Sequence, residues 1–188
     1  MKGHPDHQAL ALLRRRDPRG IEQTYRSHAI ALRSFLYRMT GDGELADDLL
    51  QHVFLRLAER GPDLRPDSNL RAWLFRVARN ACYDQLQLRH ENGVVRDGLE
   101  SLQCPEPDAE AKLLVRDVES ALASLRAPDR ELLLLVGVEG FSMETISEIL
   151  GVDPVSLRQR LSRARSRLLD VLQESKDHHA PSALRSEA

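Results

Sequence analysis

The chain has 188 residues with a formal net charge of −2, and 41% of them are hydrophobic, 30% charged and 4% aromatic. This length suits one domain or two small ones, and the shortage of aromatic residues favours helical cores over a large sheet. No apolar run approaches the roughly 18 residues that span a bilayer, and the N-terminus MKGHPDHQAL lacks the apolar core of a signal peptide. We therefore expect a cytoplasmic protein.

The first predicted helix begins at an Asp-Pro pair. Asp17 is a typical N-cap residue, and Pro18 suits the first helical position. The segment that follows, RGIEQTYRSHAIALRSFLYRMTG, repeats apolar residues mostly at three- and four-residue steps, which is the period of an amphipathic helix. Gly41 and Gly43 are expected to end this helix.

Two further helices are predicted at short intervals. The segment ELADDLLQHVFLRLAERG has apolar residues on one face and stops at a Gly-Pro pair. After a Pro-rich turn, LRAWLFRVARNACYDQLQLRH has a stripe that we expect to be buried, formed by Leu70, Trp73, Leu74, Val77 and Ala81. The short connections between these helices favour a compact bundle.

The pattern changes in HENGVVRDGLESLQCPEPDAE, where six acidic residues accompany a single arginine. Prolines and self-repelling charge predict a flexible, extended linker here. Helical patterns resume in AKLLVRDVESALASLR, PDRELLLLVGVEG and SMETISEILG, and the tail ESKDHHAPSALRSEA has no apolar stripe. The predicted fold is therefore all-α, with two small helical domains joined by an acidic linker.

An arginine-rich segment, GVDPVSLRQRLSRARSRLL, follows the last of these helices. Asp153 can cap a helix that starts at Pro154, and its apolar stripe consists of Leu157, Leu161, Ala164 and Leu168. A short helix, a turn at Gly151 and this second helix form a helix-turn-helix pattern. In that motif the second helix enters the major groove of DNA.

The polar side chains of this helix divide into two groups. Arg158, Gln159 and Arg163, with Ser156 and Ser162, face outward near its start, and Arg and Gln can bind guanine and adenine edges. Arg160, Arg165 and Arg167 lie nearer the borders of the apolar stripe and suit phosphate contacts. A merely solvated helix face is the alternative, but such faces usually mix charges, and this one has no acid from Pro154 through Leu169.

Other kinds of site find little support in the sequence. Cys82 and Cys104 have neither metal-site spacing nor a disulfide framework, so we expect two inert thiols; a redox switch between them is the alternative, and disulfides are rare in the cytosol. No nucleophile–base pair, Gly-rich phosphate loop or metal-ligand cluster is recognisable. The sequence therefore predicts a protein that is not an enzyme and that uses no cofactor, metal or small-molecule substrate.

The chain resembles the extracytoplasmic-function (ECF, group IV) sigma factors of bacterial RNA polymerase. Three stretches in this order carry the resemblance: ELADDLLQHVFLRL, NLRAWLFRVARNACYD and LASLRAPDRELLLLVGVEGFSMETISEILGVDPVSLRQRLSRARSRL. The resemblance implies sigma region 2 at residues 1–90, a linker at 91–111, region 4 at 112–172 and a disordered tail at 173–188. It also implies an alternative sigma factor that directs promoter-specific initiation under the control of an anti-sigma factor.

The resemblance assigns DNA contacts to both domains. Region 4 of the family reads the −35 element as duplex, at positions that correspond to Val155, Ser156, Arg158, Gln159, Ser162 and Arg163. Region 2 melts and captures the −10 element, and the corresponding helix offers Arg71, Phe75, Arg76, Arg79, Asn80, Tyr83 and Arg89. Aromatic and amide side chains suit an unstacked base, although Phe75 and Tyr83 equally suit a core.

The resemblance also implies protein partners. The family binds the β′ coiled coil and the β flap of core RNA polymerase, and Asp47, Asp48, Gln51 and Phe54 match its β′-binding helix. An ordinary solvated helix face explains these carboxylates almost as well. The implied anti-sigma factor is a membrane-anchored protein that clamps regions 2 and 4.

The sequence departs from the family in three places. His52 stands where the family commonly has Glu, Val155 stands where it often has Gly, and QLQLRH replaces a dense basic run. Two other functions compete with the sigma factor. One is a stand-alone helix-turn-helix repressor or activator that binds duplex operators as a dimer, and the other is an interaction module whose helices hold an inhibitor.

Overall fold

The structure is a computed structural model that describes residues 5–91 and 109–179, and every regular element in these two ranges is helical. Most of the predicted acidic linker and the last part of the predicted tail lie outside the described residues. The helices of the first range are α1 (Pro5–Arg14), α2 (Pro18–Thr40), α3 (Gly43–Arg60), the 3-10 turn η1 (Gly61–Asp63) and α4 (Leu70–Glu91). Those of the second are α5 (Ala109–Ser124), α6 (Ala127–Leu133), the π-helical turn η2 (Leu134–Val138), α7 (Met143–Leu150) and α8 (Pro154–His179).

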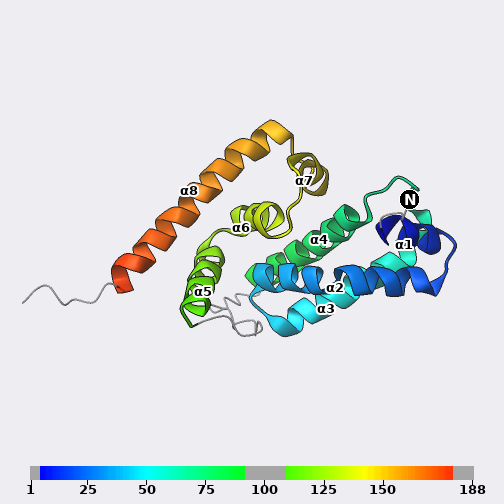
Figure 1. Ribbon diagram of the computed structural model, residues 1–188, viewed down its shortest axis with the longest axis horizontal. Helices are drawn as coiled ribbons and strands as arrows, with labels where there is room; N and C mark the ends of the chain where they lie inside the picture. Colours follow the sequence, from blue (N-terminus) through cyan, green and yellow to red (C-terminus); the bar gives the residue numbers. More distant parts are fainter. Residues whose placement is uncertain (1–4, 92–108, 180–188) are drawn as a thin grey trace, which may run out of the picture.

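The structure confirms the all-α fold. Figure 1 shows α1 to α4 gathered into one bundle and α5 to α8 into a second, with α8 as its longest rod. Among the described helices, none combines the length and apolarity that crossing a membrane requires.

Local signals at the ends of α2 explain where it starts and stops. The Asp17 side chain accepts a hydrogen bond from the Arg19 backbone N–H, and Pro18 occupies the first turn, as predicted. Gly41 adopts φ 70, and its N–H donates to the Tyr37 carbonyl. The prediction for Gly43 was wrong, because this residue opens α3 behind an N-cap at Asp42.

The core of the first bundle is formed by the predicted apolar stripes. Leu32, Leu36, Val53, Leu57 and Leu74 are fully buried. Trp73 and Val77 are only half-buried, because they lie at the edge of the α4 stripe. Helix α1 was not predicted; it packs on α2 through Leu13, at a point where Gly20 leaves no room for a side chain.

The helix-turn-helix is formed as predicted. Ser142 caps α7 by accepting from the Thr145 N–H, and Gly151 ends it at φ 67. Asp153 then accepts from the N–H groups of Val155 and Ser156 at 3.0 and 2.9 Å, which starts α8 at Pro154. The stripe of α8 is buried at Leu157, Leu161 and Ala164 and half-buried at Leu168.

Two boundaries differ from the sequence-based expectation. Helix α8 continues to His179, past residue 172, where the disordered tail was expected to begin. No Pro or Gly interrupts QESKDHH, and its Gln, Glu and Lys favour helix, so the helix extends without needing an apolar stripe. Helix α5 begins at Ala109, inside the predicted linker.

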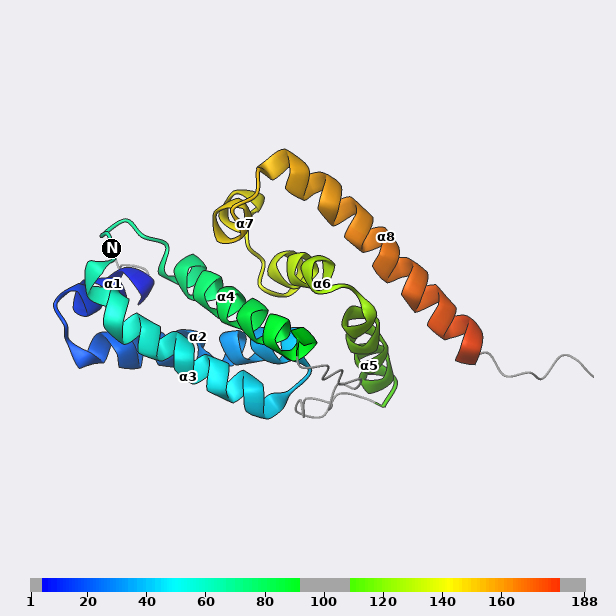
Figure 2. The same cartoon turned by 180° about the vertical axis from the view of Figure 1, so that it is seen from behind.

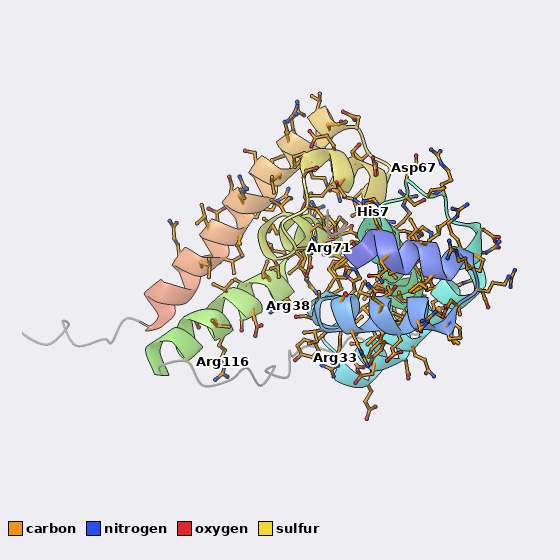
Figure 3. All side chains as sticks on the ribbon, turned by 45° about the vertical axis from the view of Figure 1, so that its right-hand side comes forward. His7, Arg33, Arg38, Asp67, Arg71 and Arg116 are labelled. Atoms are coloured by element: carbon orange, nitrogen blue, oxygen red, sulfur yellow. The ribbon has the colours of Figure 1, made fainter. Side chains whose placement is uncertain are left out.

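The two bundles are packed against each other. Helix α4 lies on the side of its bundle that faces α6 and α7, whereas α3 lies on the side away from α7 (Figures 1 and 2). Figure 3 shows Arg71 and Arg38 where the two groups of helices meet.

Candidate nucleic-acid interfaces

The outer face of α8 is accessible over its first four turns. Val155 is 60% exposed, and the other exposed side chains of this face are Ser156, Arg158, Gln159, Ser162, Arg163 and Arg165. Among the side chains that the structure describes, no carboxylate forms an ion pair with Arg158, Arg163 or Arg165. Arg163 makes only a long hydrogen bond, of 3.4 Å, to the Gln159 carbonyl. Glu144 of α7 lies close enough to Arg158 for the two charges to interact, and the face as a whole presents an excess of positive charge to solvent.

Two of the predicted phosphate contacts are placed differently. Arg167 donates to the buried carboxylate of Asp129 at 2.5 Å, and Arg126 contacts the same oxygen at 3.2 Å. Arg160 is half-buried and lies close enough to Glu131 to oppose, in small part, the rise in pKa that burial causes at that carboxyl. Both side chains thus lie near carboxylates of α6, although that of Arg167 is still 45% exposed.

The face of α4 that carries the other candidate DNA contacts is contacted by the second bundle, although Arg76 and Asn80 remain exposed. Arg71 Nη2 lies 2.8 Å from both the carboxylate and the carbonyl oxygen of Glu139. Its guanidinium carbon also sits 4.2 Å from the centre of the Phe141 ring. One turn further along, Arg76 donates to the carbonyl of Glu148 at 2.7 Å.

Glu131, which is 1% exposed, contacts two more candidate residues of α4, Arg79 and Tyr83. Arg79 Nε lies 2.8 Å from one carboxylate oxygen, and the Tyr83 hydroxyl donates to the other at 3.0 Å. The Arg79 N–H is not directed at its oxygen, so this contact is an ion pair without a well-formed hydrogen bond. Burial raises the pKa of the Glu131 carboxyl, against the opposing effect of Arg79.

The same burial affects the neighbours of Glu131. Burial, reinforced by the Glu131 carboxylate, raises the pKa of the Tyr83 hydroxyl above its ordinary value. For the same two reasons the pKa of the Cys82 thiol rises to about 12, so this thiol stays protonated, as expected of an inert cysteine. Cys104 lies outside the described residues.

Two further candidates on α4, Asn80 and Phe75, differ in exposure. Asn80 is exposed, and its side-chain oxygen accepts from Arg79 at 3.1 Å. Phe75 is fully buried, with its ring 5.3 Å from that of Phe35 and 5.1 Å from that of Phe141. In this arrangement Phe75 is a core residue and is closed to a base.

The candidate polymerase contacts lie on the outer side of α3. Asp48 and Gln51 are exposed, and Phe54 packs on Tyr25 with the two ring centres 4.9 Å apart. Asp47 is held by two hydrogen bonds from Arg33, at 2.6 and 2.9 Å, which lower the pKa of its carboxyl. All four candidates are thus brought to one accessible surface, away from the contact between the bundles.

Charged residues of α6 were missed by the sequence reasoning. Asp129 and Glu131 are buried acidic residues, and Arg130 donates to carbonyls at the end of α5 and to the Met39 carbonyl of α2. The signal was the run Asp129-Arg130-Glu131 directly before four leucines, since charged residues rarely enter a core without partners. No cluster of His, Cys, Asp and Glu suited to a metal ion occurs in the described part of the chain.

Comparison with known proteins decides the family. Residues 24–91 match sigma-70 region 2, and residues 116–168 match sigma-70 region 4. The chain is 35% identical to the ECF RNA polymerase sigma factor EcfG of Rhodopseudomonas palustris, over 76% of this chain and 79% of that one. The chain belongs to the ECF sigma factors. Sigma factors are transcription initiation factors without enzymatic activity, so the expectation of a non-enzyme is confirmed as well.

Other relatives agree with this membership. The sigma factor CarQ of Myxococcus xanthus is 33% identical over 82% of this chain and 90% of its own length. Among solved structures, the sigma factor RpoE of Bartonella quintana, in complex with the anti-sigma factor NepR, is 32% identical with a TM-score of 0.69, covering 81% of this ECF sigma factor and 96% of RpoE. CnrH, in complex with the cytosolic domain of CnrY, shares the fold with a TM-score of 0.72 at 24% identity, over 91% and 99% of the two chains.

Proposed function

We propose that this ECF sigma factor binds core RNA polymerase through the outer side of α3 and reads promoters with α8 and α4. The observation that carries the proposal is the start of α8, where exposed arginines without described carboxylate partners follow a well-capped helix-turn-helix. A polyanion is the partner that such a surface fits, and the second helix of this motif is the one that enters the major groove.

Within α8 we propose a division between base readers and phosphate contacts. Val155, Ser156, Arg158, Gln159, Ser162 and Arg163 lie on the exposed face near the helix start, where side chains reach base edges. Arg165 is exposed further along and suits a phosphate. Arg160 and Arg167 reach DNA only if they leave their positions near Glu131 and Asp129.

For the −10 element we propose that α4 supplies Arg71, Phe75, Arg76, Arg79, Asn80 and Tyr83. Arginines follow the strand backbone, and Asn80 and Tyr83 suit an unpaired base. These residues need a rearrangement before they bind a strand, because Arg71, Arg76, Arg79 and Tyr83 contact the second bundle and Phe75 is buried beneath it.

On α3 we propose Asp47, Asp48, Gln51 and Phe54 as the contacts to the β′ coiled coil, and we assign binding of the β flap to region 4. The acidic, accessible surface of α3 is complementary to a basic partner. The domain limits of 1–90, 91–111 and 112–172 remain part of this proposal, and a cytoplasmic location follows from it.

We also propose an anti-sigma factor as a regulatory partner, anchored in the membrane. Two structural neighbours of this chain were solved in complex with anti-sigma factors. One of them, the sigma factor RpoE, is 32% identical to this chain. Membership of the ECF family argues against the two functions that competed in the sequence analysis, a stand-alone repressor and an inhibitor-holding module.

Run-off transcription with purified core polymerase separates these functions. The sigma factor should yield transcripts from a cognate promoter only when core polymerase is added. A repressor instead shifts duplex DNA on its own, with half-sites about one helical turn apart. An interaction module gives neither result, and the absence of transcripts across a promoter library would contradict our proposal.

A further inference from the structure

Three consecutive arginines lie at the turn between α1 and α2. Arg14, Arg15 and Arg16 are exposed, and within residues 5–91 and 109–179 no carboxylate forms an ion pair with any of them. The carboxylate that follows them, Asp17, is already bound by Arg19, whose Nη2 lies 2.6 Å from it. The turn therefore projects three positive charges from a chain whose net charge is −2.

The backbone of this turn has a conformation that arginine rarely adopts. The Arg16 N–H donates to the Leu13 carbonyl at 2.9 Å. The Asp17 N–H donates to the Leu12 carbonyl at 3.0 Å, and the two bonds together form the Schellman pattern that closes a helix. Arg16 occupies the left-handed position of this pattern at φ 57, where glycine is the preferred residue. An arginine here costs backbone stability, which points to a role for its side chain.

Close packing holds the turn against the neighbouring helices. Leu13 is buried where the backbone of Gly20 approaches it, and a Cβ on Gly61 would lie 3.3 Å from the Leu13 side chain. This contact brings the end of α3, with the exposed Arg60, beside the turn. Arg60 likewise has no ion-pair partner among the carboxylates that the structure describes. We call Arg14–Arg16 and Arg60 the basic end of the first bundle.

The basic end lies where a strand bound to α4 would arrive. The turn between α1 and α2 is at the end of the first bundle farthest from α5, and α4 begins at this same end (Figures 1 and 2). Arg79, Arg76 and Arg71 follow one another along α4 towards that end. A strand that contacts these arginines and continues past the start of α4 therefore runs towards the basic end.

A nucleic-acid backbone is the partner that these charges fit. Guanidinium groups bind phosphate oxygens through paired N–H donors, and several arginines held together match the repeated charges of a strand. Residues 14–19 and 58–63 include no aromatic side chain that could stack on a base. The helix dipole favours a cation in the last turn of α1, which explains Arg14 but not Arg16 beyond the helix end. The basic end is thus suited to phosphates and not to reading bases.

We propose that the basic end is a second nucleic-acid contact of region 2, which binds phosphates of the unpaired promoter strand just beyond the −10 element. This inference rests on the proposed function of α4, because that helix delivers the strand. Phosphate contacts carry no sequence information, so this site adds affinity without changing which promoter is chosen. An acidic surface of another protein is the competing occupant.

Arg16→Gly separates a binding role from a structural one. Glycine adopts the left-handed position without strain, so the variant should melt at a higher temperature than the wild type, as measured by circular dichroism. Its holoenzyme should nevertheless bind more weakly to a promoter probe whose non-template strand is unpaired from the −10 element onward, as measured by fluorescence anisotropy. Stability and binding that change in the same direction would contradict the proposal.

The salt dependence of the same binding reaction counts the contacts. Arg15→Ala should reduce the slope of log affinity against log salt concentration by about 0.7, the value for one phosphate of a single strand. The triple variant Arg14→Ala/Arg15→Ala/Arg16→Gly should reduce it by about 2. Arg116→Ala is the matched control, because Arg116 is exposed on α5, away from the first bundle's basic end (Figure 3), and its removal should leave the slope unchanged.

Neutral methylphosphonate linkages, placed one at a time beyond the −10 element, locate the contact. They should weaken binding of the wild-type holoenzyme at the contacted phosphates and have no effect there on the triple variant. If the wild-type holoenzyme does not bind the unpaired strand at all, the proposed function of α4 fails. If it binds the strand but the triple variant has the same slope and the same scan, the function stands and this inference is refuted. A triple variant that loses affinity for core polymerase but not for DNA would also refute it, in favour of a protein partner.

Discussion

Two glycines at helical positions of the first bundle illustrate how single residues position α1 and α3. At Gly20, a Cβ would lie 2.7 Å from the backbone nitrogen of Leu13 and 3.0 Å from two of the side-chain atoms nearby. At Gly43, the nearest atom is the flexible end of Arg33, 3.9 Å away. The first glycine is required by the close approach of two backbones, and the second is not.

Gly20→Ala should therefore destabilise the first bundle by about 1–3 kcal/mol, since α1 has to shift to admit a methyl group. Urea unfolding followed by the fluorescence of Trp73, the single tryptophan, measures this change. Gly43→Ala is the matched control and should be neutral or slightly stabilising, because alanine favours helix and meets no neighbour. Equal losses for the two variants would contradict the close-approach argument.

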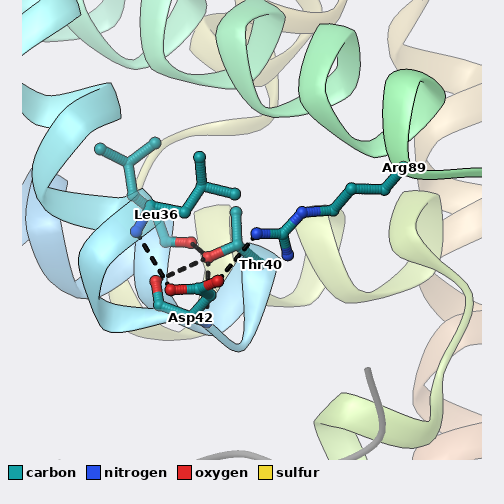
Figure 4. A network of polar contacts seen from close by, with 5 residues as sticks. Leu36, Thr40, Asp42 and Arg89 are labelled. Atoms are coloured by element: carbon teal, nitrogen blue, oxygen red, sulfur yellow. Dashed lines mark hydrogen bonds and ion pairs between the residues drawn. The ribbon is translucent and has the colours of Figure 1, made fainter. Parts of the chain in front are cut away.

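Asp42 links α3 and α4 with one side chain, and its backbone contacts Thr40 at the end of α2. Its carboxylate accepts from the Leu45 N–H at 3.1 Å, which caps α3, and it binds Arg89 of α4 at 2.8 Å (Figure 4). Thr40, at the end of α2, donates from its hydroxyl to the Leu36 carbonyl beside it. Arg89 is thus engaged within the protein, although the sequence offered it as a phosphate contact.

Asp42→Ala should lower the free energy of unfolding by about 1–2 kcal/mol through loss of the cap. Asp42→Asn retains an oxygen that caps α3 but loses the charge opposite Arg89, so its effect should be smaller. Thermal unfolding of both variants distinguishes the two contributions. A loss as large for Asn as for Ala would assign the stabilisation to the ion pair instead.

At the scale of whole elements, α8 combines a structural and a recognition role on different arginines. Arg167 anchors α8 to α6 through Asp129, whose side chain is 3% exposed, whereas Arg163 projects from the exposed face near the helix start. Because Arg163 and Arg167 occupy different positions on α8, they have different neighbours. The two residues should respond to substitution in opposite ways.

Arg167→Ala should reduce stability by about 1–3 kcal/mol, because Asp129 is buried and loses one of its two charged partners. Arg163→Ala should leave stability unchanged but weaken binding to the −35 duplex by about 1–3 kcal/mol and relax sequence specificity. Calorimetric melting and duplex titrations with the holoenzyme measure the two effects. Identical behaviour of the two variants in both assays would refute the division.

Elements with strong local signals were predictable from the sequence. Helices α2, α7 and α8 have N-caps at Asp17, Ser142 and Asp153, followed by apolar residues at helical spacing. Helix α1 was not predicted from the sequence, and its packing depends on Gly20 of another helix. The π-helical turn η2 lies within a run of leucines and valines, where the spacing of apolar residues does not distinguish one type of helix from another.

The candidate site was predictable only in part, because some of its contacts join residues that are far apart in the sequence. Exposure of Arg158 and Arg163 follows from helical geometry alone. The partners of Arg71 and Arg79 lie dozens of residues away, at Glu139 and Glu131, and such pairings are set by how the domains meet. A sequence read helix by helix contains Glu131 and Glu139 but does not show what they face.

At the scale of the whole molecule, the contact between domains carries buried carboxylates and should therefore respond to pH. The groups facing Glu131 are Arg79, Tyr83, Cys82 and Arg160, and burial raises its pKa above the ordinary 4.5 in spite of the two arginines. Burial likewise raises the pKa of Glu139, with Arg71 and Arg38 opposing it. Both acids are solvated, and their pKa values ordinary, when the domains separate.

The sign of the pH effect follows from proton linkage. In the range above 4.5 and up to the raised pKa values, the closed state binds more protons than the open state, so lowering the pH favours closure. Scattering from about pH 8 to pH 5 should show a falling radius of gyration as protons neutralise the two acids. Glu131→Gln imitates the protonated acid, so it should be at least as closed as the wild type at neutral pH and should change less with pH. A radius that grows on acidification would mean that attraction between Arg79 and the ionised Glu131 outweighs the cost of burying them, and the domains would then be held together by charge.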